Sequence, residues 1–217
     1  MSYTAEQFRA AWVRAALVEW TMNVPASNAD RITQYFAGIG WQWYLDERGV
    51  RGKYSELRRT QTGHLNYCGV GPAWVGVHLL GHYLEDRMSV NARLKPSVAR
   101  ICLPGTPRMV DPARWKAAGV EMPDRVPVDD VAANDLITVT TSGRRDEGDH
   151  FALVVKLGPS ELHGVGAVGD EVLTLEWNAN GMLGDRTQGR GVALRTRRRA
   201  MIRRVHRLHA GCFEAEE

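Results

Sequence analysis

Apolar residues recur at every fourth position close to the start of the chain. The stripe consists of Phe8, Trp12, Ala16 and Trp20. Thr4 and Gln7 precede it with the types and spacing of a capping box, in which two side chains cap the first turn of a helix. The pattern therefore predicts an amphipathic helix over residues 5–21, with the aromatic stripe in the protein core.

Two more helices are indicated farther along the chain. One follows Asn28, a favourable N-cap residue, and ends at the glycines of GIGW. The other follows Cys68 in the segment CGVGPAWVGVHLLGHYLE, which has Pro72 in its first turn. Its apolar positions at helical spacing are Val75, Leu79 and Tyr83. This second segment predicts a central, buried helix.

The spacing of apolar residues changes in the C-terminal half. LITVTT, HFALVVKL, EVLTLEW and VALRTR are short, rich in β-branched residues and separated by Gly, Pro, Asp and Asn, as is typical of strands. Helices followed by strands, without βαβ alternation, predict an α+β fold in which the helix after Cys68 packs on an antiparallel sheet. For residues 86–134 we expect mostly irregular structure, with one short helix signalled by Asp111, Pro112 and Gly119.

Length and composition fit one globular domain. The 217 residues, with 44% hydrophobic and 24% charged side chains, are enough for one sizeable core. We expect residues 1–63 to form a helical extension packed on a core domain of residues 64–217. No apolar stretch is long enough to cross a bilayer, so we expect a soluble protein that does not insert into membranes.

Basic residues concentrate in the segment RTRRRAMIRRVHRLH near the C-terminus, although the net charge is only +3. A solvated strand face explains such a run, and so does attraction to an acidic polymer such as a cell wall or nucleic acid. No motif of a nucleic-acid-binding module accompanies the run, so we expect no nucleic-acid partner.

The cysteines offer a candidate nucleophile. Three cysteines cannot all pair within the chain, so at least one thiol is free. Cys68 is expected at the N-terminus of a helix, where unpaired N–H groups and the positive end of the dipole lower the pKa of a thiol and make it nucleophilic. A free cysteine is also often a small buried apolar residue, and position alone does not separate these two interpretations.

A catalytic thiol also needs a base and a group that orients the base. His150 opens the strand HFALVV, where it would be able to reach Cys68, although a histidine at a strand end is also common on a protein surface. Glu176 and Asn178 lie near the end of the strand TLEWNANG. Alternation places both on one face, with Trp177 on the other. Asn178 is equally explained as part of the turn that ends this strand.

The order of these motifs resembles the NlpC/P60 and CHAP families of papain-like cysteine peptidases and amidases. In these families a cysteine that starts a helix is followed by a strand opening with histidine, here HFALVV, and by a TIEGN-like strand, here TLEWN. ANDLITV is similar to their GDIV-like strand, and TLEWNANGMLGDRTQGRGVALRTR is similar to TIEGN with its arginine-containing turn. The similarity covers residues 66–199. The chain departs from the DCSG and TIEGN patterns at Tyr67 and Trp177.

The resemblance implies a papain-like, NlpC/P60-type fold and acyl transfer by a cysteine and a histidine. Cys68 corresponds to the nucleophile and His150 to its general base. Glu176 and Asn178 correspond to the residues that orient the base, and which of the two is more important stays open. We expect neither a cofactor nor a metal ion.

Peptidoglycan is the usual substrate of these families, so the resemblance implies an amidase or endopeptidase that cleaves its peptide stems. The N-terminus lacks the pattern of a Sec signal, so we expect synthesis in the cytoplasm and delivery to the periplasm or wall of a target cell. A phage lysin or an antibacterial effector of a secretion machine, such as a type VI system, fits this route. A component of that machine and a cognate immunity protein are then expected partners.

Several other interpretations compete with this one. A papain-like hydrolase or transferase acting on a target protein or a lipid would use the same residues, and a noncatalytic interaction protein could keep the fold. His78 and His82 are spaced as in HExxH metalloproteases, but Leu79 replaces the glutamate and we identify no third ligand, so we expect ordinary packing or surface positions. Gly69 and Gly71 are not followed by the GK[ST] of a phosphate loop.

Overall fold

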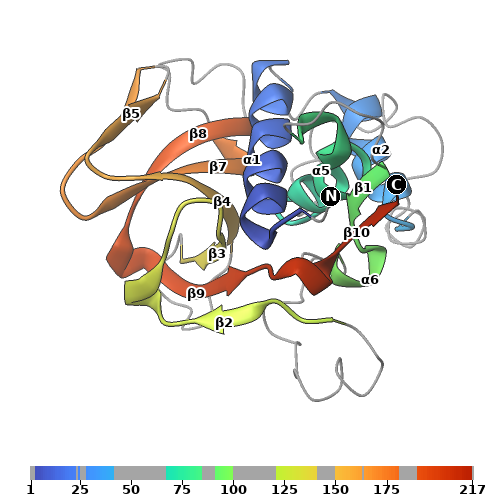
Figure 1. Ribbon diagram of the computed structural model, residues 1–217. Coiled ribbons are helices and arrows are strands. Elements are labelled where there is room, and N and C mark those ends of the chain that lie inside the picture. Colours follow the sequence, from blue (N-terminus) through green and yellow to red (C-terminus); the bar gives the residue numbers. More distant parts are fainter. Residues whose placement is uncertain are drawn as a thin grey trace.

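Helices and the main sheet lie on opposite sides of the molecule (Figure 1). A computed structural model of the protein describes residues 3–22, 24, 28–41, 67–84, 91–99, 121–140, 150–162, 164–180 and 190–216. The α-helices are α1 (Ala5–Thr21), α2 (Ala29–Gly38), α5 (Val70–His78) and α6 (Pro96–Ala99). The 3-10 helices are η2 (Leu80–Tyr83), η4 (Val128–Asp130), η5 (Arg199–Met201) and η6 (Ala210–Cys212).

The strands form one main sheet and two small ones. Their bounds are β1 (Asn91–Leu94), β2 (Asp124–Val126), β3 (Leu136–Val139), β4 (His150–Leu157), β5 (Ser160–Leu162), β6 (Val165–Ala167), β7 (Glu171–Asn180), β8 (Arg190–Arg198), β9 (Ile202–Arg207) and β10 (Phe213–Glu216). Within the described residues, the main sheet has the order β2-β9-β3-β4-β7-β8, and all its neighbouring strands are antiparallel. This confirms the predicted α+β class and the antiparallel sheet.

The three predicted helices are present as α1, α2 and α5. The hydroxyl of Thr4 accepts a hydrogen bond from the N–H of Gln7 at 3.2 Å, and the Gln7 side chain accepts one from the N–H of Thr4 at 2.8 Å. The predicted capping box is thereby confirmed. Asn28 caps α2 by accepting from the N–H of Arg31 at 3.1 Å. α5 starts two residues after Cys68 and continues as η2.

The sequence pattern did not predict every element. β1, α6, β2 and η4 lie within residues 86–134, where mostly irregular structure was expected, so that expectation is wrong for these described parts. β9 lies in the basic segment, whose arginines hide the apolar pattern of Ile202 and Val205. The short helix signalled by Asp111, Pro112 and Gly119 lies outside the described residues. The proposed domain boundary between residues 63 and 64 also lies outside them.

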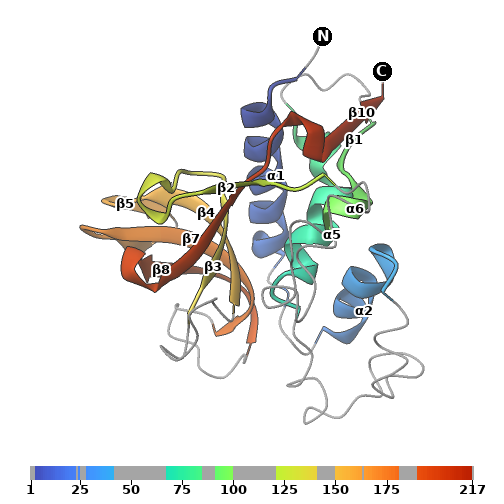
Figure 2. The same ribbon diagram turned by 90° about the horizontal axis from the view of Figure 1, so that it is seen from below.

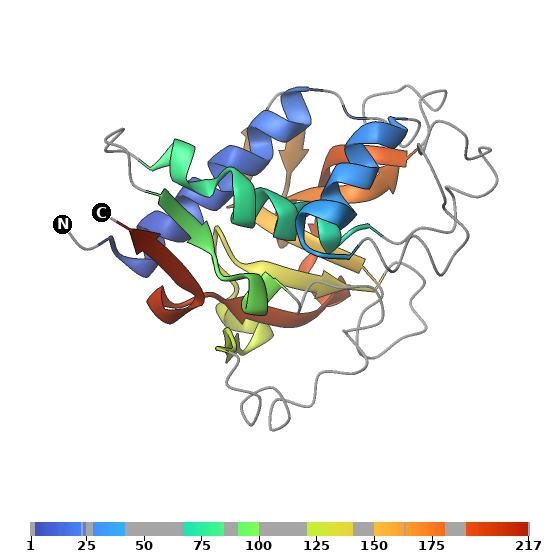
Figure 3. The same cartoon turned by 90° about the vertical axis from the view of Figure 1, so that its right-hand side faces the viewer.

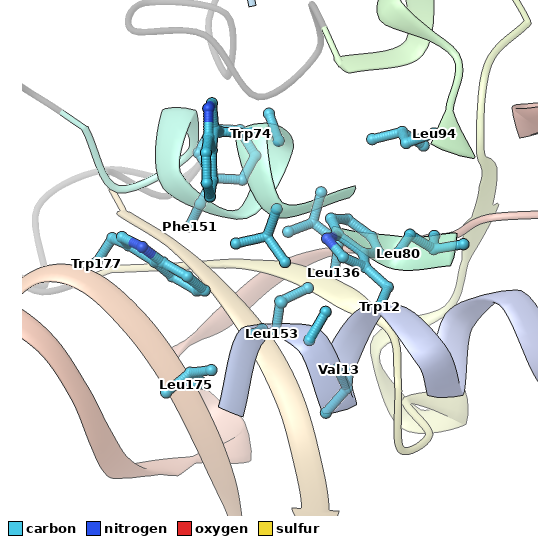
Figure 4. Close-up of a cluster of buried hydrophobic side chains, with 14 of the residues drawn as sticks. Trp12, Val13, Trp74, Leu80, Leu94, Leu136, Phe151, Leu153, Leu175 and Trp177 are labelled. Carbon is cyan, nitrogen blue, oxygen red and sulfur yellow. The ribbon is translucent and has the colours of Figure 1, made fainter. Parts of the chain in front are cut away.

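The main sheet buries apolar side chains on both faces, because successive residues of a strand point to opposite sides. On β7, Leu173, Leu175 and Trp177 belong to the large core between the sheet and the helices. Leu175 and Trp177 are labelled in Figure 4. Val172 belongs to a smaller cluster on the other face. That cluster consists of Val131, Ile137, Val139, Ala152, Val154, Val172, Ile202 and Val205. By this alternation Glu176 shares the face of Val172, opposite to that of Trp177.

The helix-facing side of the sheet is covered by α1 together with α5, and α2 packs on the outer side of α5 (Figures 2 and 3). Trp12 of α1 donates a hydrogen bond from Nε1 to the carbonyl of Pro72 in α5 at 2.8 Å. Residues before and after position 64 therefore share one core. Among the helices of the described part of the chain, none has both the length and the apolar character needed to span a membrane.

A buried ion pair joins the N-terminal helices. Glu19 of α1 is fully buried, and its carboxylate accepts hydrogen bonds from Nε and Nη2 of Arg31 at 2.7 and 2.6 Å. The hydroxyl of Tyr35 donates to the same carboxylate. The guanidinium of Arg31 lies 4.3 Å from the ring centroid of Trp74, which is part of α5. These contacts connect α1 and α2 to the helix that follows Cys68.

The basic segment near the C-terminus runs from β8 through η5 into β9. Arg207 donates to both oxygens of Asp135 at 2.9 and 2.8 Å, and Arg203 donates to the carbonyl of Ala200 at 2.6 Å. Arg199 donates to the carbonyl of Asp129 at 3.4 Å. These partners within the protein favour the interpretation of this run as an ordinary strand face.

Candidate active site

Cys68 lies in the turn that leads into α5. Its neighbour Gly69 is the N-cap residue of the helix, so the thiol stands at the end where backbone N–H groups are unpaired and the helix dipole is positive. Cys68 keeps part of its surface exposed, whereas Cys212, the other free cysteine in the described residues, is fully buried. Of these two thiols, only Cys68 is accessible to a substrate.

The start of α5 packs directly on β7. A Cβ atom at Gly71 would lie 2.1 Å from Cδ1 of Trp177, so the observed contact requires glycine. Trp177 is fully buried and lies below α5 in Figure 4. Trp177, which departs from the TIEGN pattern, thus fills the core and fixes β7 relative to the turn of Cys68. Tyr67, the other departure from the family patterns, is also buried.

His150 is the first residue of β4, opposite Val139 of β3. It is buried, and a hydrogen bond joins its imidazole to the sulfur of Cys68. The backbone N–H groups of Phe151 and Gly69 also donate to this sulfur. The structure thus brings Cys68 and His150 together and surrounds the sulfur with donors that stabilise a thiolate.

Glu176 lies on the other side of the imidazole. Nε2 of His150 is 3.0 Å from Oε2 of Glu176, a distance that makes the two a close ion pair when the imidazole is protonated. Since Nε2 faces Glu176, we assign the contact with the sulfur of Cys68 to Nδ1. A carboxylate in this position holds the orientation and tautomer of an imidazole.

Two further side chains contact the carboxylate of Glu176, which is fully buried. Arg197 of β8 donates from Nε to Oε1 at 2.7 Å and from Nη2 to Oε2 at 2.6 Å. The hydroxyl of Thr174 donates to Oε1 at 2.7 Å. Neither residue was predicted from the sequence. Alternation in TLEW indicates that Thr174 shares the face of Glu176, whereas the contact with Arg197 depends on a pairing of β7 and β8 that the sequence does not specify.

The three predicted residues shift one another's titration. Burial by itself raises the pKa of Cys68, but the hydrogen bond and charge of His150 and the two N–H donors outweigh it and lower the pKa below its ordinary value. Burial disfavours the imidazolium of His150, yet hydrogen bonds with Cys68 and Glu176 and their negative charges raise its pKa to about 10. Burial also opposes ionisation of Glu176, whose pKa Arg197 and His150 lower to about 2. These directions favour a thiolate, an imidazolium and a carboxylate at neutral pH.

Asn178, the fourth predicted site residue, lies in β7, but its side chain is outside the described part of the chain. The register between β7 and β8 shifts between Glu176 and Ala179. This irregularity interrupts the simple alternation from which a shared face of Glu176 and Asn178 was expected. The role of Asn178 therefore stays a prediction.

The histidines considered as metal ligands do not form such a site in the described residues. Nε2 of His78 lies 2.8 Å from the carbonyl of Gly38, so this ring contacts the end of α2. His82 is exposed. No group of three or more His, Cys, Asp or Glu residues in the described ranges is arranged to hold a metal ion.

The described contacts combine three features that activate a thiol as a nucleophile. A partly exposed sulfur stands at a helix N-terminus, an imidazole contacts it, and a buried carboxylate holds the imidazole. These groups come from the turn before α5, from β4 and from β7, which are distant in sequence and are held together by the core. No protein-family model matches the chain, and no match was found among curated proteins or among solved structures.

Proposed function

We propose that this protein is a cysteine hydrolase that cleaves amide bonds. Cys68 is the nucleophile, His150 is the general acid and base, and Glu176 orients the imidazole. The observation that carries this proposal is the contact of a helix-terminal thiol with an imidazole whose Nε2 lies 3.0 Å from a buried carboxylate. The lowered pKa of Cys68 and the raised pKa of His150 support a reactive ion pair.

In the proposed reaction, the Cys68 thiolate attacks the carbonyl carbon of an amide and a C–S bond forms while the carbonyl oxygen becomes negative. The backbone N–H of Cys68, at the start of the helix, is our candidate donor to this oxyanion. The C–N bond then breaks, and the departing amine takes a proton from the His150 imidazolium. Water attacks the resulting thioester, His150 accepts a proton from that water, and the thiolate leaves with the acid product released.

For the substrate we propose the peptide stems of peptidoglycan. The order of the motifs around Cys68, His150 and Glu176 resembles the NlpC/P60 and CHAP families, and a helix that starts two residues after the thiol and packs on an antiparallel sheet fits their papain-like fold. Since a fold by itself does not determine a substrate, this step rests on the resemblance. Delivery as a phage lysin or as a secreted antibacterial effector, with an immunity protein as partner, is part of the same proposal.

Digestion of purified peptidoglycan tests the substrate. Sacculi incubated with the protein are expected to release fragments in which mass spectrometry finds one stem amide replaced by a free amine and a free carboxylate, which identifies the bond. The Cys68→Ala variant, at the same concentration, is the matched control and is expected to release none. If sacculi from several wall types stay intact while the protein cleaves a general amide substrate, the hydrolase proposal stands and peptidoglycan is rejected.

A further inference from the structure

The carboxylate of Glu176 is saturated with donors, and half of them belong to one side chain of the neighbouring strand. Oε1 of Glu176 accepts hydrogen bonds from Nε of Arg197 at 2.7 Å and from the hydroxyl of Thr174 at 2.7 Å. Oε2 accepts a hydrogen bond from Nη2 of Arg197 at 2.6 Å and lies 3.0 Å from Nε2 of His150. Only the contact with His150 bears on the proposed chemistry directly. The remaining contacts determine where the carboxylate sits.

We propose that Arg197 is a positioning residue of this site. Its bidentate ion pair fixes the position and the plane of the Glu176 carboxylate, so that the carboxylate faces His150. This inference rests on the proposed function. A guanidinium that donates two parallel hydrogen bonds holds both oxygens of a carboxylate and stops its rotation, which a single ammonium donor does not. Glu176 is fully buried and the Arg197 side chain is 11% exposed, so little water competes for the pair.

Thr174 is a weaker candidate for the same role. Its hydroxyl lies 2.7 Å from Oε1 of Glu176 and 3.1 Å from the carbonyl of Arg195, and a hydroxyl has a single hydrogen to donate. Thr174 therefore shares its donor between two acceptors. Arg197 directs two separate N–H groups at Glu176 from β8, which is paired with β7 along most of its length. The ladder between these strands gives the ion pair a rigid support.

The charged groups around Glu176 allow the positioning role to be distinguished from a general effect of charge. His150 of β4 and Arg195 and Arg197 of β8 face it, and Cys68 lies beyond the imidazole. Loss of a positive charge acts on the thiolate through space and raises the pKa of Cys68 slightly, whatever Glu176 does. Loss of positioning acts through Glu176, because the imidazolium loses its support. An effect of charge alone would therefore be absent in Arg197→Lys and undiminished in a Glu176→Gln background, whereas a positioning effect would appear in Arg197→Lys and disappear in that background.

The test is the rate of alkylation of Cys68 by iodoacetamide as a function of pH, measured on the intact protein. Alkylation needs no substrate, so the result does not depend on whether peptidoglycan is cleaved. In Arg197→Met, the pH at which the rate falls on the acid side is expected to rise by about one unit or more. Arg197→Lys is expected to shift it by less. Arg198→Met, an exposed neighbour on the same strand, is the matched control and should leave the curve unchanged.

A double variant provides the second readout. If Arg197 acts through Glu176, Arg197→Met adds no further upward shift in a Glu176→Gln background, since the residue it positions is already neutral. A downward shift or no shift in Arg197→Met, or a full additional shift in the double variant, would overturn the inference. If Arg197→Met does not fold, Arg197→Lys decides alone, and a curve identical to wild type overturns it. Failure of the proposed function looks different, because the wild-type thiol would then titrate like an ordinary cysteine.

Discussion

Cys68→Ala is expected to reduce amide hydrolysis by at least about 10⁴-fold, to the background rate of the assay. The reason is that alanine removes the atom that forms the covalent bond, and no other described thiol is both accessible and next to an imidazole. Initial rates on the fragments released from peptidoglycan measure the effect. Circular dichroism should show an unchanged fold, because the side chain is small and lies in a partly exposed turn.

The other cysteines are the controls for this prediction. Cys212 is fully buried, and burial raises its pKa to about 11, so it is not a nucleophile at neutral pH. We would replace it by alanine, because serine would bury a hydroxyl in the core. Cys102 lies outside the described residues, and Cys102→Ser serves there. Both variants are expected to keep turnover within a few fold of wild type. Substantial hydrolysis by Cys68→Ala, or loss of hydrolysis in Cys102→Ser, would show that the assignment of Cys68 as the nucleophile is wrong.

Glu176→Ala is expected to lower turnover by about a hundredfold to ten-thousandfold, with a smaller change in KM. An orienting group does not form the covalent bond, so its loss costs less than the loss of Cys68, but two buried cations, His150 and Arg197, lose their counter-ion at once. Part of the effect therefore appears as reduced stability, and thermal unfolding should be measured in parallel. Glu171→Ala, at the half-buried start of the same strand, is the matched control and should leave turnover unchanged.

Asn178→Ala belongs to the same series, because its role stays open. If Asn178→Ala lowers turnover as much as Glu176→Ala, both residues orient the imidazole. If the loss of turnover is small, Glu176 is the principal orienting group. If neither substitution changed hydrolysis or the titration of the thiol, the orienting assignment would be wrong. Asp149 and Asp146, next to the histidine strand and outside the described residues, would then be the first alternatives.

The elements that local chemistry determines could be predicted from the sequence. The start of α1 is indicated by Thr4 with Gln7, and the start of α2 by Asn28, since a helix cap involves residues only three apart. Alternation of apolar residues likewise indicates β4 and β7. β9 was missed because Arg203 and Arg204 interrupt its apolar positions, and nothing local distinguishes a strand from a charged loop there.

For the candidate site, residue types and order along the chain were enough to single out Cys68, His150 and Glu176, and these side chains are in contact. Arg197 could not be found in this way. It lies opposite Val172 in the ladder and reaches Glu176 across the strands, and such a contact follows from the strand register, which the sequence does not state. The buried pair of Glu19 and Arg31 was missed for the same kind of reason, because it depends on how α1 and α2 pack.

The central claim is that His150 activates Cys68, and the pH dependence of Cys68 alkylation in wild type and in His150→Ala tests it most directly. Since His150 lowers the pKa of the thiol, wild type should keep a high rate as the pH falls well below the range of ordinary thiols, and lose it only at the lowered pKa. In His150→Ala the thiol should titrate near its ordinary pKa of about 8.5, and its alkylation rate at pH 6 should be at least about tenfold lower. Two identical curves, both rising near that ordinary pKa, would contradict the account.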